Sequence, residues 1–206
     1  MHVMSVNIGA GRRLEGRRTG IFKVPTARPV QIGALGLAGD VVCDKRHHGG
    51  EDQAVYLYRS EDYGWWSRQR GVELGPGTFG ENITLSGLPS ADLVIGSRLH
   101  FPQVVLEVSA PRIPCNTLAK RMEDSTFVKA FKAAERPGFY ARVLQTGPIA
   151  SGEDFRLEVP DGLRATTVEL YRSWGRRMSL EELDHFLAAP IDIRTRTKLE
   201  ADRARR

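Results

Sequence analysis

The feature that most constrains this chain is a series of short apolar runs separated by glycine and proline. The runs are four to seven residues long and rich in β-branched or aromatic side chains, and they cover residues 3–8, 54–58, 82–85, 98–101, 104–109, 139–145 and 155–159. Such runs have the length and composition of β-strands. Many short strands joined by glycine-rich turns favour a barrel or a sandwich, so we predict a body that is mainly β.

Three helices are expected within this body. Ser60 is placed to cap a helix that ends at Gly71, with acidic residues in its first turn. A short helix is predicted over residues 116–122. Ser125 is placed to cap a third helix, which must stop before Pro137.

The sequence pattern changes from strand-like to helical after residue 160. A helical pattern covers residues 165–174, and Ser179 with Glu182 forms a capping-box pattern that predicts the start of another helix. A proline then breaks the chain before a last, basic helix. We therefore divide the chain into a body, residues 1–162, and a three-helix segment, residues 163–206.

Charge and cysteine content limit the function classes. The net charge of +5 arises largely from the last 13 residues, which hold six basic and two acidic side chains. A charged run of this kind is usually a solvated surface, so we expect no nucleic-acid partner. No apolar run approaches the ~20 residues that span a bilayer, and the first residues lack a secretory signal pattern, so we expect a cytoplasmic protein without a membrane partner.

A polar loop precedes the strand predicted at residues 54–58. Between Gly39 and Asp52 the chain holds three Asp, one Glu, two His, one Lys and one Arg. Its adjacent histidines point to opposite sides of an extended backbone, which argues against one shared metal ion. A functional site and a solvated loop with one backbone-bonded histidine both remain open.

A second loop, residues 71–80, is rich in glycine and ends in Glu81 and Asn82. Backbone N–H groups of glycines can bind anions. The lysine and hydroxyl residue of a P-loop do not follow, which argues against nucleotide triphosphate binding. A simple connecting loop is the competing interpretation.

Cys115 follows Pro114 at the start of the short helix, and Arg112 lies nearby in sequence. A helix N-terminus and neighbouring cations lower the pKa of a thiol, so this position favours a thiolate. The alternative is a small buried hydrophobic residue, which is the commoner fate of a lone cysteine and the one that we expect for Cys43. No CxxC pair occurs, and hence we predict neither a disulfide framework nor a zinc ribbon.

Five ordered segments resemble the MOSC domain, the C-terminal domain of molybdenum cofactor sulfurases, and within that family the YiiM-like branch. They are GD…HHGGEDQAVYLY, GPGTFGENITLSGL, IGSRLHF, LEVSAPRIPCNTLAKR and RPGFYARVL…ASGE, which together extend over residues 39–158. The resemblance implies a β-barrel of the pyruvate-kinase type, followed by a small C-terminal helical segment. It also overturns the interpretation of Cys115 as a buried hydrophobic residue.

The resemblance implies a molybdenum cofactor with Cys115 as the protein ligand to the metal. A soft thiolate suits such a centre, and metal binding keeps it deprotonated. Catalytic roles fall to Cys115 and to a proton donor, for which His47, His48 and Glu81 are the candidates. The expected cofactor contacts are Lys45, His47, His48, Gly49, Gly50, Asn82, Arg112 and Asn116.

The activity implied by the family is two-electron reduction of N-hydroxylated compounds such as hydroxylaminopurines and amidoximes. The alternative is a non-catalytic carrier of the cofactor or of persulfide sulfur. No cysteine follows Cys115, so we expect no fused ferredoxin-type iron–sulfur centre and expect a separate flavin or iron–sulfur protein as the electron donor. We expect no pyridoxal phosphate, because the sequence offers no suitable lysine environment.

Overall fold

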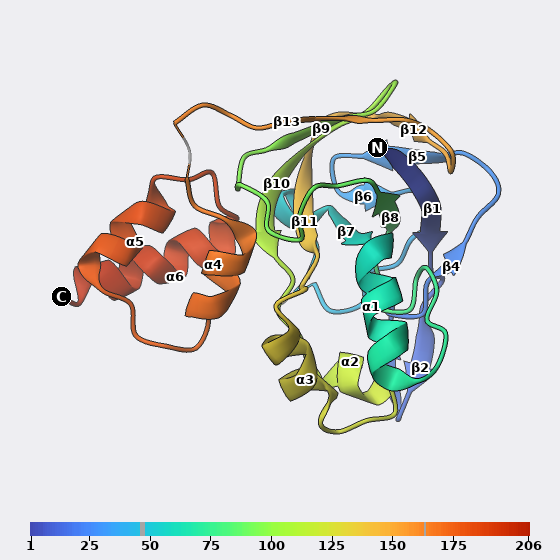
Figure 1. The fold of residues 1–206 in the computed structure, drawn as a ribbon, viewed down its shortest axis with the longest axis horizontal. Coiled ribbons are helices and arrows are strands. Elements are labelled where there is room, and N and C mark those ends of the chain that lie inside the picture. Colours follow the sequence, from blue (N-terminus) through green and yellow to red (C-terminus); the bar gives the residue numbers. More distant parts are fainter. Residues whose placement is uncertain (46–47, 163) are drawn as a thin grey trace.

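The structure is a computed structural model that describes residues 1–45, 48–162 and 164–206. An eight-stranded sheet forms its body (Figure 1). The strands lie in the order β13 (Arg156–Glu158), β9 (Arg98–His100), β10 (Val105–Pro111), β11 (Phe139–Gln145), β7 (Val55–Arg59), β8 (Ile83–Ser86), β1 (His2–Ile8) and β4 (Val24–Pro25). Neighbours pair antiparallel, except that β7 and β8 run parallel.

Two smaller sheets complete the β structure. The first pairs β12 (Gly147–Ile149), β5 (Val30–Gly33) and β6 (Gly36–Leu37), and the second is a hairpin of β2 (Arg12–Leu14) and β3 (Arg17–Thr19). Each of the seven predicted runs contains a strand, which confirms the β-rich body. The strands that the sequence did not reveal have four residues or fewer.

The predicted barrel closure is not confirmed. Within the described residues the large sheet is open, with β13 and β4 as its edge strands. Strand β4 has only two residues, and one of them is Pro25, which lacks a backbone N–H group to donate to a further strand. The start of β1 does bond to the segment that precedes β13, because the Val3 N–H group donates to the Glu153 carbonyl at 2.8 Å and the Phe155 N–H group donates to the Met1 carbonyl at 3.0 Å. The fold is a mixed α and β structure around an open sheet.

Strand β7 separates two cores. Val55 and Leu57 belong to the main apolar core of the sheet, whereas Tyr56 and Tyr58 face an aromatic cluster on the other side. Successive side chains of a strand point to opposite faces, so one strand supplies both cores. Four of its five residues are buried for this reason.

The aromatic cluster fixes the helices of the body. These are α1 (Ser60–Arg70), α2 (Asn116–Arg121) and α3 (Phe127–Ala134), and a short 3-10 helix, η1 (Glu51–Gln53), precedes β7. Phe127 and Phe131 share the buried face of α3, and the Trp66 ring stacks on Phe131 with centroids 5.7 Å apart. Leu118 of α2 is fully buried in the same cluster. The cluster therefore holds α2, and with it Cys115, in a fixed position.

The predicted helix starts in the body need correction. Ser60 is the first residue of α1 rather than its cap, and the N-cap residue is Arg59, whose side chain makes no capping hydrogen bond. The N-cap residue of α3 is Thr126, one residue later than expected, and its N–H and hydroxyl groups donate to Asp124 instead of capping the helix. Gly71 ends α1 in the left-handed conformation, as predicted.

Three helices follow the body, namely α4 (Thr167–Ser173), α5 (Leu180–Leu187) and α6 (Ile193–Ala204). The capping box of Ser179 and Glu182 is present at α5. These helices share an apolar core that also takes in Ile95 of the body. Figure 1 places them beside β10, where the Asp192 N–H group donates to the Ser109 carbonyl at 3.1 Å. The domain boundary between residues 162 and 163 stays a prediction.

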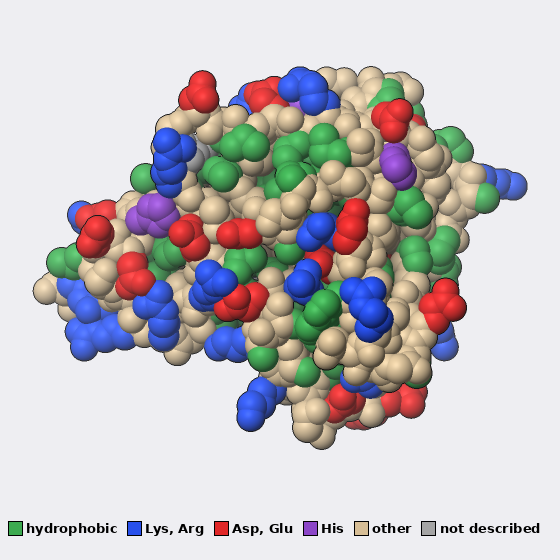
Figure 2. Space-filling view, viewed as in Figure 1, with side chains coloured by type: hydrophobic (Ala, Val, Ile, Leu, Met, Phe, Trp, Pro, Cys, Tyr) green, Lys and Arg blue, Asp and Glu red, His purple; other side chains and the backbone are tan. Residues whose placement is uncertain are grey.

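The surface of this helical end carries mixed charge. Lys and Arg side chains lie among Asp and Glu side chains at the left of Figure 2. Ion pairs such as Arg203 with Asp184 and Arg176 with Glu182, both at 2.5 Å, balance part of the positive charge of this end. Among the described helices, none has the length and apolarity needed to cross a membrane.

Candidate active site

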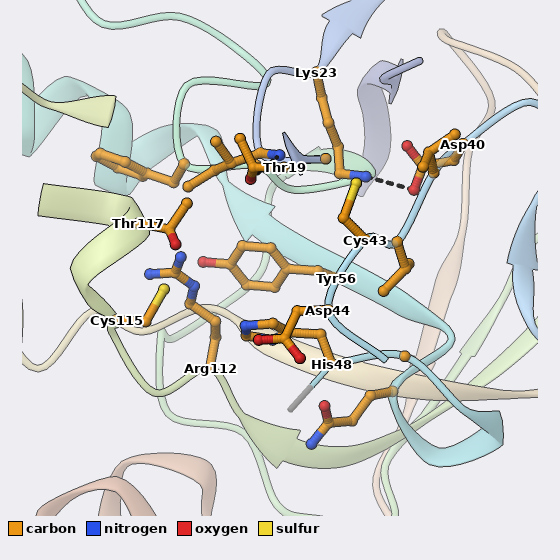
Figure 3. A pocket seen from close by; sticks show the side chains of 18 of the residues that line it. Thr19, Lys23, Asp40, Cys43, Asp44, His48, Tyr56, Arg112, Cys115 and Thr117 are labelled. Atoms are coloured by element: carbon orange, nitrogen blue, oxygen red, sulfur yellow. Dashed lines mark hydrogen bonds and ion pairs between the residues drawn. The ribbon is translucent and has the colours of Figure 1, made fainter. Parts of the chain in front are cut away.

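A cavity of about 600 Å³ opens where the basic hairpin, the polar loop and the start of α2 meet. We call it the large cavity. Figure 3 shows side chains from these segments pointing into it. Its lining residues are Leu14, Arg17, Arg18, Thr19, Gly20, Ile21, Lys23, Asp40, Val41, Val42, Cys43, Asp44, His48, Gly49, Gln53, Ala54, Tyr56, Phe79, Gly80, Asn82, Arg112, Cys115, Asn116, Thr117, Lys120 and Tyr140.

Cys115 lies at one wall of the large cavity as the N-cap residue of α2, one position before the predicted first turn. Burial raises the pKa of its thiol, but a hydrogen bond with His48, the positive charge of Arg112 and the Leu118 N–H group outweigh burial and lower the pKa to about 6. A thiol with this pKa is mostly thiolate at neutral pH. The geometry therefore supports the prediction that Cys115 readily forms a thiolate.

Arg112 supplies the positive charge beside this thiolate (Figure 3). Its side chain is only 4% exposed and lies 5.6 Å from the centroid of the Tyr56 ring. Burial lowers the pKa of the guanidinium, but Tyr56 and Cys115 raise it, and the net direction is upward. Its Nη1 atom has no hydrogen-bond partner among the described residues. A buried charged donor without a partner is rare and indicates a ligand or water at this position.

His48 contacts both the Cys115 thiol and the Tyr140 hydroxyl. Its Nδ1 atom lies 3.3 Å from the Tyr140 hydroxyl, and its ring also bonds the Cys115 thiol. The loop that carries His48 is held from the C-terminal helices, because Arg194 of α6 donates to the Gly49 carbonyl at 2.8 Å and to the His48 carbonyl at 3.4 Å. Arg194, which lies 146 positions after His48 in the sequence, thus fixes the loop that carries His48.

The far wall of the large cavity is built on a buried ion pair. Lys23 and Asp40 form it, with side chains 7% and 6% exposed. The Asp40 carboxylate also accepts a hydrogen bond from Asn82 Nδ2 at 2.9 Å. Arg17, Arg18 and Lys120 add cationic side chains to the lining. The walls therefore suit an anionic ligand.

Two glycines allow the walls to approach one another. A Cβ atom on Gly20 would meet the Val41 carbonyl oxygen at 1.9 Å, so the end of the hairpin packs directly on the polar loop. Gly49 adopts a φ of 73°, which few other residues tolerate, and it is buried in the lining. The predicted role of Gly49 in close backbone approach fits this position.

Some predicted site residues lie elsewhere. Lys45 and Gly50 are exposed and do not line the large cavity, and His47 lies outside the described residues. Arg194 donates to the carbonyl of the exposed Lys45 at 3.3 Å. His48, Gly49, Asn82, Arg112, Cys115 and Asn116 do line the cavity.

Glu81 is buried within the fold and does not line the large cavity. It is 0% exposed and absent from the lining. Its carboxylate accepts hydrogen bonds from the Gly77 N–H group at 2.6 Å, the Thr84 hydroxyl at 2.8 Å and the Tyr63 hydroxyl at 2.8 Å. Burial raises its pKa although these hydrogen bonds lower it. We therefore do not assign Glu81 a role in proton delivery.

The sequence did not single out the hairpin or the tyrosines of the site. Arg17, Arg18, Lys23, Tyr56 and Tyr140 all line the large cavity. The basic run RRLEGRR was a signal that could have indicated the hairpin wall. Within the described part of the chain, no group of three or more His, Cys, Asp or Glu side chains gathers as a metal site.

The chain is similar to known proteins of one family. A family model described as the MOSC domain matches residues 44–156. YflK of Bacillus subtilis, an uncharacterized protein, is 35% identical over 159 residues, which are 75% of this chain and 72% of YflK. A Gibberella moniliformis protein named as a reductase is 31% identical over 161 residues, covering 74% of this chain and 28% of that protein. The crystal structure of YiiM from Geobacillus stearothermophilus superposes with a TM-score of 0.82 at 28% identity, covering 98% of each chain.

Proposed function

Because the chain belongs to the MOSC domain family, we propose that it binds a molybdenum cofactor in the large cavity and reduces N-hydroxylated compounds. The observation that carries this proposal is the Cys115 thiol, whose pKa is lowered to about 6 beside the buried Arg112. The similarity to a protein named as a reductase supports redox chemistry. The volume of about 600 Å³ lies within the roughly 300–1,000 Å³ typical of small-molecule sites.

The residues present fit the cofactor in three respects. The Cys115 thiolate is a soft ligand, as a soft metal centre requires. The unpartnered Nη1 atom of Arg112 is a charged donor that an acceptor atom of the cofactor would satisfy. Arg17 and Arg18 of the hairpin offer cations to a phosphate group, whereas Lys23 and Lys120 form ion pairs with Asp40 and Glu15.

The net reaction breaks the N–O bond of the substrate, releases the oxygen as water and consumes two electrons and two protons. When bound, the molybdenum cofactor would supply the two-electron chemistry of this reduction. The chain itself holds the thiolate in place through the fixed N-terminus of α2. Arg112 keeps positive charge beside that thiolate, which stabilises it against protonation.

His48 is the residue that we assign to proton delivery. It lines the large cavity, bonds the Cys115 thiol and lies 3.3 Å from the Tyr140 hydroxyl. Histidine is the side chain best suited to exchange protons near neutral pH. We propose that electrons come from a separate flavin or iron–sulfur protein, because the chain has only two cysteines.

The test compares two cysteine variants of protein produced in a host that makes the cofactor. We expect molybdenum and pterin to accompany the wild type and Cys43→Ser, and to be lost from Cys115→Ser. Cys43 is a matched control because it lines the same cavity on the Lys23 side (Figure 3). A wild type without molybdenum and pterin would remove the proposal.

Turnover separates the reductase from a carrier. A reductase converts benzamidoxime to benzamidine with an artificial electron donor, at a rate that vanishes in Cys115→Ser. A carrier of the cofactor or of sulfur would retain molybdopterin and yet show no steady-state reduction of benzamidoxime or of 6-N-hydroxylaminopurine. Steady reduction by the wild type excludes the carrier as the whole function.

A further inference from the structure

A second cavity of about 290 Å³ lies between the body and the C-terminal helices. We call it the small cavity. The body contributes Ala110, Pro111, Ile113 and Pro114, and the helical segment contributes Leu170, Trp174, Asp192, Arg194 and Thr195. It shares His48, Gln53, Cys115 and Tyr140 with the large cavity. The two cavities therefore meet at the thiol.

Two buried oxygen atoms in the lining of the small cavity lack hydrogen-bond donors. Asp192 is 1% exposed, and its Oδ1 atom accepts from the Thr195 N–H group at 3.3 Å and from Gln53 Nε2 at 3.4 Å. Its Oδ2 atom has no partner among the described residues, and neither has Gln53 Oε1. Leaving a buried carboxylate oxygen without a donor is costly, so these two acceptors indicate a ligand that brings N–H groups.

The remaining wall indicates the shape of that ligand. Leu170, Trp174, Ile113 and the two prolines present apolar surface, and Trp174 offers a flat aromatic ring. The volume of about 290 Å³ is at the lower end of small-molecule sites and suits one or two rings. A planar ring compound with an N–H edge satisfies both the apolar wall and the two acceptors.

We propose that the small cavity is the substrate site, in which Asp192 and Gln53 bind the N–H edge of a planar aryl amidine or amino-substituted heteroaromatic ring. The inference rests on the proposed function, since it names the substrate class for the same thiol. The nitrogen to be reduced then reaches Cys115 from the side opposite the cationic wall. Arg194 also lines the small cavity and balances the charge of Asp192, so this site selects a ligand by its N–H donors and flat shape rather than by net charge.

The experiment measures equilibrium binding of benzamidine to the full chain by calorimetry, without an electron donor. Benzamidine carries the amidine edge but no N–O bond, so no turnover interferes. The main variant is Asp192→Asn, which keeps a good helix cap but removes the charge and one acceptor. Glu200→Gln is the matched control, because Glu200 lies on the same helix with a side chain 58% exposed.

We expect wild type and Glu200→Gln to bind benzamidine equally, and Asp192→Asn to bind at least about tenfold more weakly, as for a charge-assisted hydrogen bond. Gln53→Met keeps the side-chain volume, removes the second acceptor and should weaken binding roughly 2- to 10-fold. If thermal melting shows that Asp192→Asn does not fold, Gln53→Met alone tests the proposal. Absence of any heat of binding to the wild type, or unchanged affinity in both variants, would overturn the proposal.

The same experiment separates this inference from the proposed function. Protein that lacks molybdenum but binds benzamidine through Asp192 retains the small cavity as a ligand site and loses the reductase proposal. Protein that holds molybdenum and reduces benzamidoxime, with benzamidine affinity unaffected by Asp192→Asn, retains the reductase proposal and loses this substrate site.

Discussion

The large and small cavities differ in their walls although they share Cys115. The large cavity is lined by Lys23, Arg112 and the hairpin arginines, whereas the small cavity has mainly apolar walls, with the buried Asp192 carboxylate and Arg194 as its charged groups. The cationic wall suits anions, and the apolar wall with its free acceptor oxygens suits flat N–H donors.

The two walls also come from different parts of the chain. The basic hairpin and polar loop precede residue 57, while Leu170, Trp174 and Thr195 belong to the helical segment. Changes in one wall can therefore leave the other intact, and paired variants can test whether the cavities act separately.

The largest expected effect on stability comes from the buried ion pair of the large cavity. Lys23→Met leaves the Asp40 carboxylate buried without its cation, which should lower the free energy of unfolding by about 3 kcal/mol. Arg203→Met breaks the exposed pair with Asp184 and should cost less than about 1 kcal/mol. Urea unfolding measures both, and equal losses would contradict a buried charged wall.

Arg112→Met tests the charge at the shared wall. Removing the guanidinium should raise the pKa of Cys115 above about 6 and lower cofactor retention about 10- to 100-fold, because a charged donor is lost. Arg112→Lys keeps the charge and should recover part of both properties. Molybdenum content after dialysis is the measurement, and full retention in Arg112→Met would show that the cationic wall does not bind the cofactor.

Ala110→Leu tests the small cavity separately from the large cavity. Ala110 is 2% exposed and lines only the small cavity of the two, so a larger side chain fills that space. We expect benzamidine affinity to fall about tenfold and molybdenum content to stay within about twofold of the wild type. If both fall together, the two cavities are not separate sites.

Local sequence signals predicted much of the fold. The seven strand runs and the Ser179 capping box depend on neighbouring residues, and each is present. Barrel closure depends on how the sheet edges pair, and the two-residue strand β4 ends the sheet there. Short strands such as those of the basic hairpin lack the apolar pattern that marks a strand.

The site was predictable where motif and chemistry coincide, as at Cys115, Arg112 and His48. Glu81 was predicted as a candidate proton donor, but its carboxylate is buried and accepts hydrogen bonds from the Gly77 N–H group and the Tyr63 hydroxyl. The spacing of residues along the sequence does not reveal such tertiary contacts. The Asp192 carboxylate was missed for a similar reason. It reaches the site only because the C-terminal helices pack against β10.

The ionisation of Cys115 is the central claim, and the pH dependence of its alkylation tests it most directly. Iodoacetamide reacts with the thiolate, so the rate at Cys115 should rise as pH increases through about 6 and level off by neutral pH. The reaction is followed in cofactor-free protein by mass spectrometry of the peptide that contains Cys115. A midpoint near 6 supports the account, and a midpoint close to the ordinary value of about 8.5 would contradict it.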